Sequence, residues 1–414
     1  MSKCEVCDVV IIGAGPAGAI AASMLVQDGW NTVVVERESF PRFSIGESLL
    51  PHCMEFVKQA GMLDALNANA DKLEFQFKNG AAFYRKGERS EFDFENKFSD
   101  GPGTTFQVKR AAFDKLLADE ASKFGADIRY QQSVEEVITH EGGATLKISA
   151  AGDSYHLKTR FVLDASGFGR VLPRLLDLNE PSDLPPRKAV FTHFKDNIKA
   201  DANFDRNKIL ITVHPEIEDV WYWLIPFSDG TSSLGVVARP ELFNDEETLE
   251  KQLWAFIHQD DNLTELFEHA EITQPARMIG GYSSNVKSLY GPNFALLGNA
   301  GEFLDPVFSS GVTIAMRSAV SAAQLVSREL NGEQVDWQSE YADSLKKGID
   351  VFKTFVTSWY DTSFQNVVFF QSQDTEIKPM ITSILAGYAW DESNPFVKSS
   401  RRGMRMLSKL CEAD

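Results

Sequence analysis

The chain has little of what would place it in a membrane or outside the cell. None of its apolar runs approaches the roughly 20 residues that a membrane-spanning helix needs. No charged segment followed by a long apolar segment opens the sequence, so we see no secretory leader. We expect a cytoplasmic protein without a membrane span.

Basic residues are scarce relative to acidic ones. The 414 residues include 41 Lys and Arg against 59 Asp and Glu, which gives a net charge of −18. Such a charge repels a nucleic-acid backbone and an anionic membrane surface. The composition argues against both as main partners, and no nucleic-acid binding is expected.

Cysteine is also rare, with four residues in the whole chain. They are too few and too scattered for a disulfide framework, so reduced thiols are expected. Cys4 and Cys7 have the spacing of zinc ligands, but no second pair completes a four-ligand site. The seven histidines show no metal-binding spacing either. We expect no metal.

The stretch around which the sequence is organised is residues 8–36, which reads as strand, glycine turn, helix and strand. Gly13, Gly15 and Gly18 have the GxGxxG spacing that permits a tight turn, close approach of a pyrophosphate and helix packing on the sheet. Free N–H groups at the helix start then face the phosphates. The alternative is a glycine-rich turn in an ordinary α/β protein.

Glu36 ends the second strand of this unit, eighteen positions after Gly18. A carboxylate there can accept hydrogen bonds from an adenosine ribose and repels a 2'-phosphate. The unit therefore favours FAD or NAD over NADP.

Alternating apolar strands and helical segments predict an α/β fold, with a Rossmann-like FAD-binding domain, an inserted antiparallel-sheet substrate domain and a helical C-terminal region. We expect the FAD-binding domain to be discontinuous, since strands ending in small residues return late in the chain, at 161–167 and 294–300. The expected boundaries are 1–70, 101–190 and 285–332 for the FAD-binding domain, 71–100 and 191–284 for the substrate-side sheet, and 333–414 for the helical region.

Three kinds of side chain are candidates for chemistry, each with a plainer alternative. Lys78, among aromatic and small residues, is an enclosed cation or amine, or a solvent-facing lysine on an amphipathic strand. Trp221 and Trp223 share one face of a strand and form either a pocket wall or core. Arg110, where an extended segment becomes a helix, reaches cofactor phosphates or caps the helix surface.

Several motifs together resemble the flavin-dependent halogenases of the p-hydroxybenzoate-hydroxylase-like flavoprotein superfamily. The loop 40–51, with Ile45-Gly46-Glu47-Ser48, is similar to the family's loop beside the flavin, and Trp221-x-Trp223-x-Ile225-Pro226 to its tryptophan motif. Lys78 falls where the family keeps a catalytic lysine. Residues 305–312, Asp-Pro-Val-Phe-Ser-Ser-Gly-Val, resemble the halide-side motif of members that act on phenols and pyrroles.

Two positions refine the resemblance. Tryptophan-chlorinating members carry glutamate at the position of Phe308, which argues against that subgroup. The superfamily usually has Gly-Asp where this chain has Gly298-Asn299, so one contact to the flavin ribityl chain is altered, although an amide still forms hydrogen bonds.

The resemblance implies an FAD-dependent halogenase that uses reduced FAD, oxygen and chloride or bromide to halogenate an electron-rich phenol or pyrrole type ring. A separate flavin reductase would supply reduced FAD. Lys78 would be catalytic and would carry or activate hypohalous acid, and Ser310 and Gly311 would hold halide. The implied cofactor-binding residues are Gly13, Gly15, Ala17, Gly18, Glu36, Arg37, Arg42, Ser48, Arg110, Asp164, Gly298, Asn299, Gly311 and Val312. The implied substrate-pocket residues are Phe83, Trp221, Trp223 and Phe308.

Other functions stay open at this point. A flavin reductase of the geranylgeranyl-reductase kind shares a similar tryptophan pattern, and an aromatic hydroxylase or an inactive FAD-binding protein is also compatible. Whether the aromatic substrate is free or tethered to a carrier protein is open too. If the cations of the basic C-terminal segment share one helix face, they could bind an acidic carrier protein. The alternative is a solvated helix end whose basic residues favour the helix dipole. The cations of the segment are Lys398, Arg401, Arg402, Arg405 and Lys409.

Overall fold

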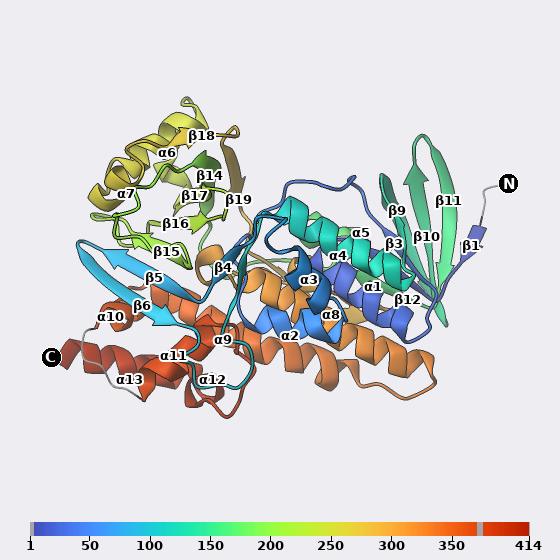
Figure 1. The fold of residues 1–414 in the computed structure, drawn as a ribbon. Helices are drawn as coiled ribbons and strands as arrows, with labels where there is room; N and C mark the ends of the chain where they lie inside the picture. Colours follow the sequence, from blue (N-terminus) through green and yellow to red (C-terminus); the bar gives the residue numbers. More distant parts are fainter. Residues whose placement is uncertain (1–3, 371–375, 414) are drawn as a thin grey trace.

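A six-stranded sheet forms the centre of the protein, seen in a computed structural model that describes residues 4–370 and 376–413 (Figure 1). Its inner strands pair in parallel and are buried on both faces, which their unbroken apolar runs predict. β21 alone pairs antiparallel. The strand order is β21 (Tyr290–Gly291), β22 (Phe294–Leu296), β12 (Phe161–Asp164), β2 (Val9–Ile12), β3 (Thr32–Val35) and β8 (Asp127–Arg129).

Three helices pack beside one another on this sheet: α1 (Pro16–Gln27), α4 (Arg110–Phe124) and α8 (Ser310–Leu330) (Figure 1). α1 is rich in alanine, and small side chains let neighbouring helices approach closely. β2 ends at Ile12 and α1 begins at Pro16, so the glycine turn lies at the carboxyl edge of the parallel strands. Ligands of open α/β sheets bind at this edge.

A smaller four-stranded sheet stands to one side of the central sheet (Figure 1). Its order is β1 (Cys4–Val6), β11 (Asp153–Thr159), β10 (Gly143–Ala150) and β9 (Gln132–His140). β9, β10 and β11 form an antiparallel ribbon, whereas β8, the strand before them, joins the central sheet.

The substrate-side sheet has eight strands, and period two divides its side chains between two cores. Tyr222 and Leu224 pack toward α6 (Leu249–Ile257) and α7 (Asp261–Leu266), whereas Trp221 and Trp223 join the main core on the other face. The sheet is antiparallel, as expected, except that β15 pairs in parallel with β5. The order is β18 (Glu271–Ile272), β14 (Lys188–Lys195), β17 (Thr231–Ala238), β16 (Trp221–Pro226), β15 (Lys208–Val213), β5 (Gly80–Arg85) and β6 (Glu88–Asp93), with β19 (Arg277–Gly280) also on β14.

Asn79-Gly80 does not form a hairpin turn, although Asn-Gly pairs are typical of such turns. β4 (Gln76–Lys78) pairs with β7 (Thr105–Gln107) in a separate sheet, and the chain then crosses into β5. Asn79 donates its N–H to Asn207 and accepts from the N–H of Phe94, while a Cβ on Gly80 would lie 2.4 Å from the Phe92 carbonyl oxygen. The crossing places Lys78 at the junction of two sheets.

The C-terminal part is helical, and its helices lie beside β5 and β6 (Figure 1). No helix in the described ranges has the length and apolarity to cross a bilayer. The α/β class with an inserted sheet and a helical C-terminal region is confirmed, and the exact domain boundaries stay a prediction. The C-terminal helices are α9 (Ser344–Tyr360), α10 (Ser363–Phe369), α11 (Ile377–Leu385), α12 (Pro395–Lys398) and α13 (Ser400–Ala413). The other α-helices and strands are α2 (His52–Gln59), α3 (Leu63–Asn69), α5 (Val171–Leu175), and the paired strands β13 (Asn179–Pro181) and β20 (Ser284–Val286).

Candidate active site

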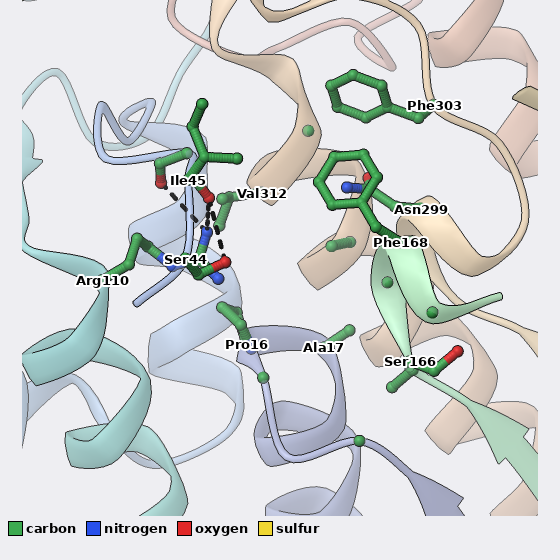
Figure 2. A pocket seen from close by; sticks show the side chains of 18 of the residues that line it. Pro16, Ala17, Ser44, Ile45, Arg110, Ser166, Phe168, Asn299, Phe303 and Val312 are labelled. Carbon is green, nitrogen blue, oxygen red and sulfur yellow. Dashed lines mark hydrogen bonds between the residues drawn. The ribbon is translucent and has the colours of Figure 1, made fainter. Parts of the chain in front are cut away.

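A cavity of about 710 Å³ runs from the glycine turn to the tryptophan strand. Figure 2 shows Pro16 and Ala17 at the start of α1, with Arg110, Ser44 and Ile45 on one side and Asn299 on the other. The predicted residues that line the cavity are Gly13, Gly15, Ala17, Glu36, Arg37, Arg42, Ser48, Arg110, Trp221, Trp223, Asn299, Gly311 and Val312.

The three glycines of the turn serve different needs. Gly13 has φ +97°, and a Cβ there would lie 2.7 Å from the Ala165 carbonyl oxygen. A Cβ on Gly18 would come within 1.9 Å of the Gly13 carbonyl oxygen. Around Gly15 the protein leaves room, because its nearest neighbour would be an Arg42 nitrogen at 3.5 Å. Gly13 and Gly18 are therefore required by the fold, whereas the open side of Gly15 faces the cavity.

Glu36 stands where a ribose-binding carboxylate is expected, with 5% of its surface exposed. It accepts the Ala14 N–H at 2.8 Å through one oxygen and the Glu38 N–H at 2.8 Å through the other. These bonds orient the carboxylate toward the cavity and leave further lone pairs for hydroxyl donors.

Two of the three predicted arginines of the cavity, Arg42 and Arg110, converge on Asp114, a residue that the sequence did not point to. Asp114, fully buried, accepts from Arg110 Nε at 2.7 Å and Nη2 at 3.0 Å, and from Arg42 Nη1 at 3.0 Å. Arg110 also donates to the Ile45 carbonyl oxygen at 2.5 Å (Figure 2). Asp114 thus holds two cations against the loop beside the cavity, and its position one helical turn after Arg110 was the available signal.

Lys78 does not line the cavity but lies directly behind it. Its side chain is fully buried, and Nζ donates to Ser48 Oγ at 2.7 Å and to the Leu49 carbonyl oxygen at 2.8 Å. No ion pair involves Lys78 among the described residues, and burial lowers the pKa of its amine to about 7. The solvent-facing alternative is wrong, because Lys78 is an enclosed amine in contact with a cavity residue.

Several other predicted residues lie away from the cavity lining. Asp164 is buried, accepts the N–H groups of Ser166 at 2.9 Å and Leu172 at 2.6 Å, and burial raises its pKa. A Cβ on Gly298 would lie 2.7 Å from the Cβ of Ala315, so this glycine lets the loop pack on α8. Gly18 and Ser310 are also outside the lining, although Ser309 and Gly311 belong to it.

Phe83 and Phe308, which we expected in the substrate pocket, pack in the core instead. Phe83 lies 5.7 Å from both Phe92 and Trp359, measured between ring centroids. Phe308 contacts Trp359 at 5.9 Å and Phe364 at 5.5 Å. The sequence could not show this, because the C-terminal helices bring the partner rings from distant positions.

The two predicted indoles do form one wall of the cavity. The rings of Trp221 and Trp223 lie 6.0 Å apart at 50°, and both are in the lining. Glu47, from the loop 40–51, also lines the cavity. Its Oε1 lies 2.6 Å from Nε2 of His193 on β14, a buried hydrogen bond. The loop 42–48 is thereby tied to the substrate-side sheet.

These residues fit FAD: the cavity has an open glycine turn, a ribose-facing carboxylate and paired arginines. A model of the FAD binding domain family matches residues 6–343. The chain belongs to this family. It is an FAD-dependent oxidoreductase of the flavin-dependent halogenase type.

Three relatives illustrate the similarity. A 1H-pyrrole-2-carbonyl-[peptidyl-carrier protein] chlorinase of Pseudomonas fluorescens is 28% identical over 92% of this chain and 89% of its own. A tryptophan 2-halogenase of Chondromyces crocatus is 31% identical over 87% and 69%, respectively. A crystal structure of a flavoprotein/dehydrogenase from Cytophaga hutchinsonii, 42% identical, superposes with a TM-score of 0.94 over 99% of both chains.

Proposed function

We propose that this halogenase transfers chlorine or bromine to an electron-rich ring of the phenol or pyrrole kind, with Lys78 as the catalytic residue. The position of Lys78 carries the proposal. An enclosed amine without an acidic partner is costly to bury. A reductase or hydroxylase has no evident use for this lysine, whereas a halogen-transferring enzyme needs a nucleophile or hydrogen-bond donor beside the cofactor cavity.

The geometry of Lys78 suits the haloamine route. FAD, when bound and reduced, supplies the oxygen chemistry that converts halide into hypohalous acid. A neutral Lys78 amine donates its two N–H groups to Ser48 and Leu49, which leaves its lone pair free. That lone pair attacks the halogen: an N–halogen bond forms, the O–halogen bond breaks, and the leaving hydroxide takes one amine proton to become water. The ring then takes the halogen from nitrogen, and the proton that the ring loses restores the Lys78 amine. In the alternative, a Lys78 ammonium donates its third N–H to hypohalous acid.

The start of α8 is the proposed halide position. The first N–H groups of a helix lack intrahelical partners and attract anions. Ser310 and Gly311 occupy these positions, and Ser309, with φ +54°, turns the chain into the helix. Gly311 lies in the cavity lining, so halide held there would be accessible from the cavity.

Two partners complete the proposal. The sequence has a single nucleotide fingerprint, which we assign to FAD, so a separate flavin reductase must supply the reduced cofactor. The P. fluorescens relative is named for a carrier-tethered pyrrole, whereas the C. crocatus relative is named for tryptophan. The tryptophan-chlorinating members carry glutamate at the position of Phe308, so the resemblance favours a phenol or a pyrrole as substrate. This substrate is either free or carried on a protein.

The test is the mass of the product. The purified protein should be incubated with reduced FAD, oxygen and bromide, and with a panel of phenols, pyrroles and indoles. Bromide-dependent appearance of a product in which bromine replaces hydrogen supports the proposal. A mass change of two hydrogens would instead favour the second candidate, a flavin dehydrogenase or reductase, which the name of the Cytophaga structure suggests. An added oxygen would indicate a hydroxylase, and an unchanged panel would contradict the proposed substrate class.

A further inference from the structure

A chain of hydrogen bonds joins the indole wall of the cavity to the halide-side motif. Trp221 Nε1 lies 3.0 Å from the hydroxyl of Tyr360, at the end of α9. The Tyr360 hydroxyl lies 2.8 Å from Asp305 Oδ2, and Asp305 Oδ1 accepts the Val307 N–H at 3.0 Å. Trp221 and Pro306 both line the cavity. Tyr360 therefore connects two walls of the site from outside it.

The hydrogen bonds of this chain run in one direction, from Trp221 through Tyr360 to Asp305. An indole N–H only donates, so the Tyr360 oxygen accepts from Trp221 and must direct its own proton to Asp305. Asp305 accepts on both oxygens, as a carboxylate does. All three side chains are held in one arrangement, because rotating any of them would leave a buried polar group without a partner.

The surroundings of Tyr360 hold its ring as well. The Arg187 guanidinium lies 4.3 Å from the Tyr360 ring centroid and pairs with Asp219 at 2.7 Å. Tyr282, which lines the cavity, places its buried hydroxyl beside Asp305. Trp223, by contrast, donates to Ser233 of its own sheet at 3.1 Å. Only Trp221 of the two indoles is anchored in the C-terminal helices.

We propose that Tyr360 is a positioning residue for halogenation: its hydroxyl fixes the Trp221 indole relative to Asp305 and the loop that follows, and so sets where the aromatic ring lies. The inference rests on the proposed function for its kinetic readout only. It gives the helical C-terminal region a part in the substrate site, although Tyr360 does not line the cavity.

The test is a double-mutant cycle of Tyr360→Phe, Trp221→Phe and the double variant. Removal of the Tyr360 hydroxyl should raise the KM for the aromatic substrate about five- to tenfold, the effect of one hydrogen bond, with little change in kcat. In the Trp221→Phe background the same removal should have almost no further effect, because the bonded indole is already absent. The dissociation constant of a simple phenol, measured by tryptophan quenching in the FAD-loaded protein without halide, should move in parallel.

Tyr341→Phe is the matched control. The Tyr341 hydroxyl is buried and also makes one hydrogen bond as donor, to the Leu296 carbonyl oxygen at 2.6 Å, outside the cavity. It should change the melting temperature but neither KM nor phenol binding. Equal KM effects from Tyr360→Phe and Tyr341→Phe, or additive effects in the cycle, would overturn the proposal. The phenol-binding arm needs no halogenation, so it decides the matter even if the proposed reaction fails. If Tyr360→Phe does not fold, Trp221→Phe serves as the test and should still weaken phenol binding. Ser233→Ala removes the hydrogen bond of the other indole, Trp223, for comparison. Phenol binding that is unchanged by Trp221→Phe would overturn the proposal.

Discussion

Lys78 donates a 2.7 Å hydrogen bond to Ser48 Oγ, and Ser48 is the member of this pair that lines the cavity. The serine therefore stands between the buried amine and the space where the cofactor fits.

Replacing Lys78 with Met should abolish halogenated product, lowering the rate by at least about 100-fold, while oxygen consumption by reduced FAD continues. Met has a similar volume without the buried amine, so the free energy of unfolding should stay the same or rise. Product mass, oxygen uptake and thermal unfolding measure the three quantities. Halogenation at the wild-type rate would show that Lys78 is not catalytic.

The pH dependence of halogen transfer should distinguish the two proposed roles of Lys78. Burial lowers the pKa of this amine to about 7, so the neutral form increases as pH rises through 7. If the lone pair carries halogen, the single-turnover rate with added hypobromous acid rises across this window and then levels off. We expect that profile. A rate that falls above pH 7 would instead indicate a Lys78 ammonium acting as donor.

Gly15→Val should remove FAD without unfolding the chain. The backbone at Gly15 has φ −65° and the protein leaves room for a side chain, but a branched one would fill the pyrophosphate approach. Gly18→Ala is the contrasting variant, because its Cβ would collide with the Gly13 carbonyl and destabilise the fold. Flavin absorbance and circular dichroism separate the two outcomes. Stoichiometric FAD on the Gly15 variant would refute the assigned site.

The C-terminal cations provide a test of carrier docking. The helix is interrupted at Ser399, so Lys398 belongs to α12 and does not share one helix face with the other cations, contrary to the expectation from the sequence. The exposed Arg401, Arg402 and Arg405 lie together on α13. Reversing these three arginines to Glu should slow turnover of a carrier-tethered pyrrole and spare the free compound. Raised salt should likewise slow turnover of the carrier-tethered pyrrole by the wild type and spare the free compound.

The control for carrier docking reverses three exposed lysines elsewhere, Lys58, Lys72 and Lys195, for the same change in net charge. An equal loss in both triple variants would mean that net charge, not docking at α13, is responsible. Unchanged turnover of the tethered substrate by the arginine variant would exclude this surface as the docking site.

Local sequence was sufficient for the parts of the protein that depend on neighbours in the chain. The strand, glycine turn and helix of residues 8–36 follow from apolar runs, from the freedom of glycine and from an acid at the strand end, and period two placed Trp221 and Trp223 on one face. Each of these signals is a short-range rule of backbone geometry, which a sequence displays directly.

Tertiary structure alone decided which distant side chains meet. Burial and two hydrogen bonds distinguish Lys78 from a surface lysine. The acceptors of both hydrogen bonds lie in the loop 48–49, about thirty residues away in the sequence. Asp114 receives two arginines, and Tyr360 reaches back to Trp221 across the domain. The sequence suggests Phe83 and Phe308 as pocket residues, but both pack against aromatic rings of the C-terminal helices in the core. Residue type determines what a side chain can do, but its pKa, its partners and its access to the cavity depend on packing between elements that no local pattern encodes.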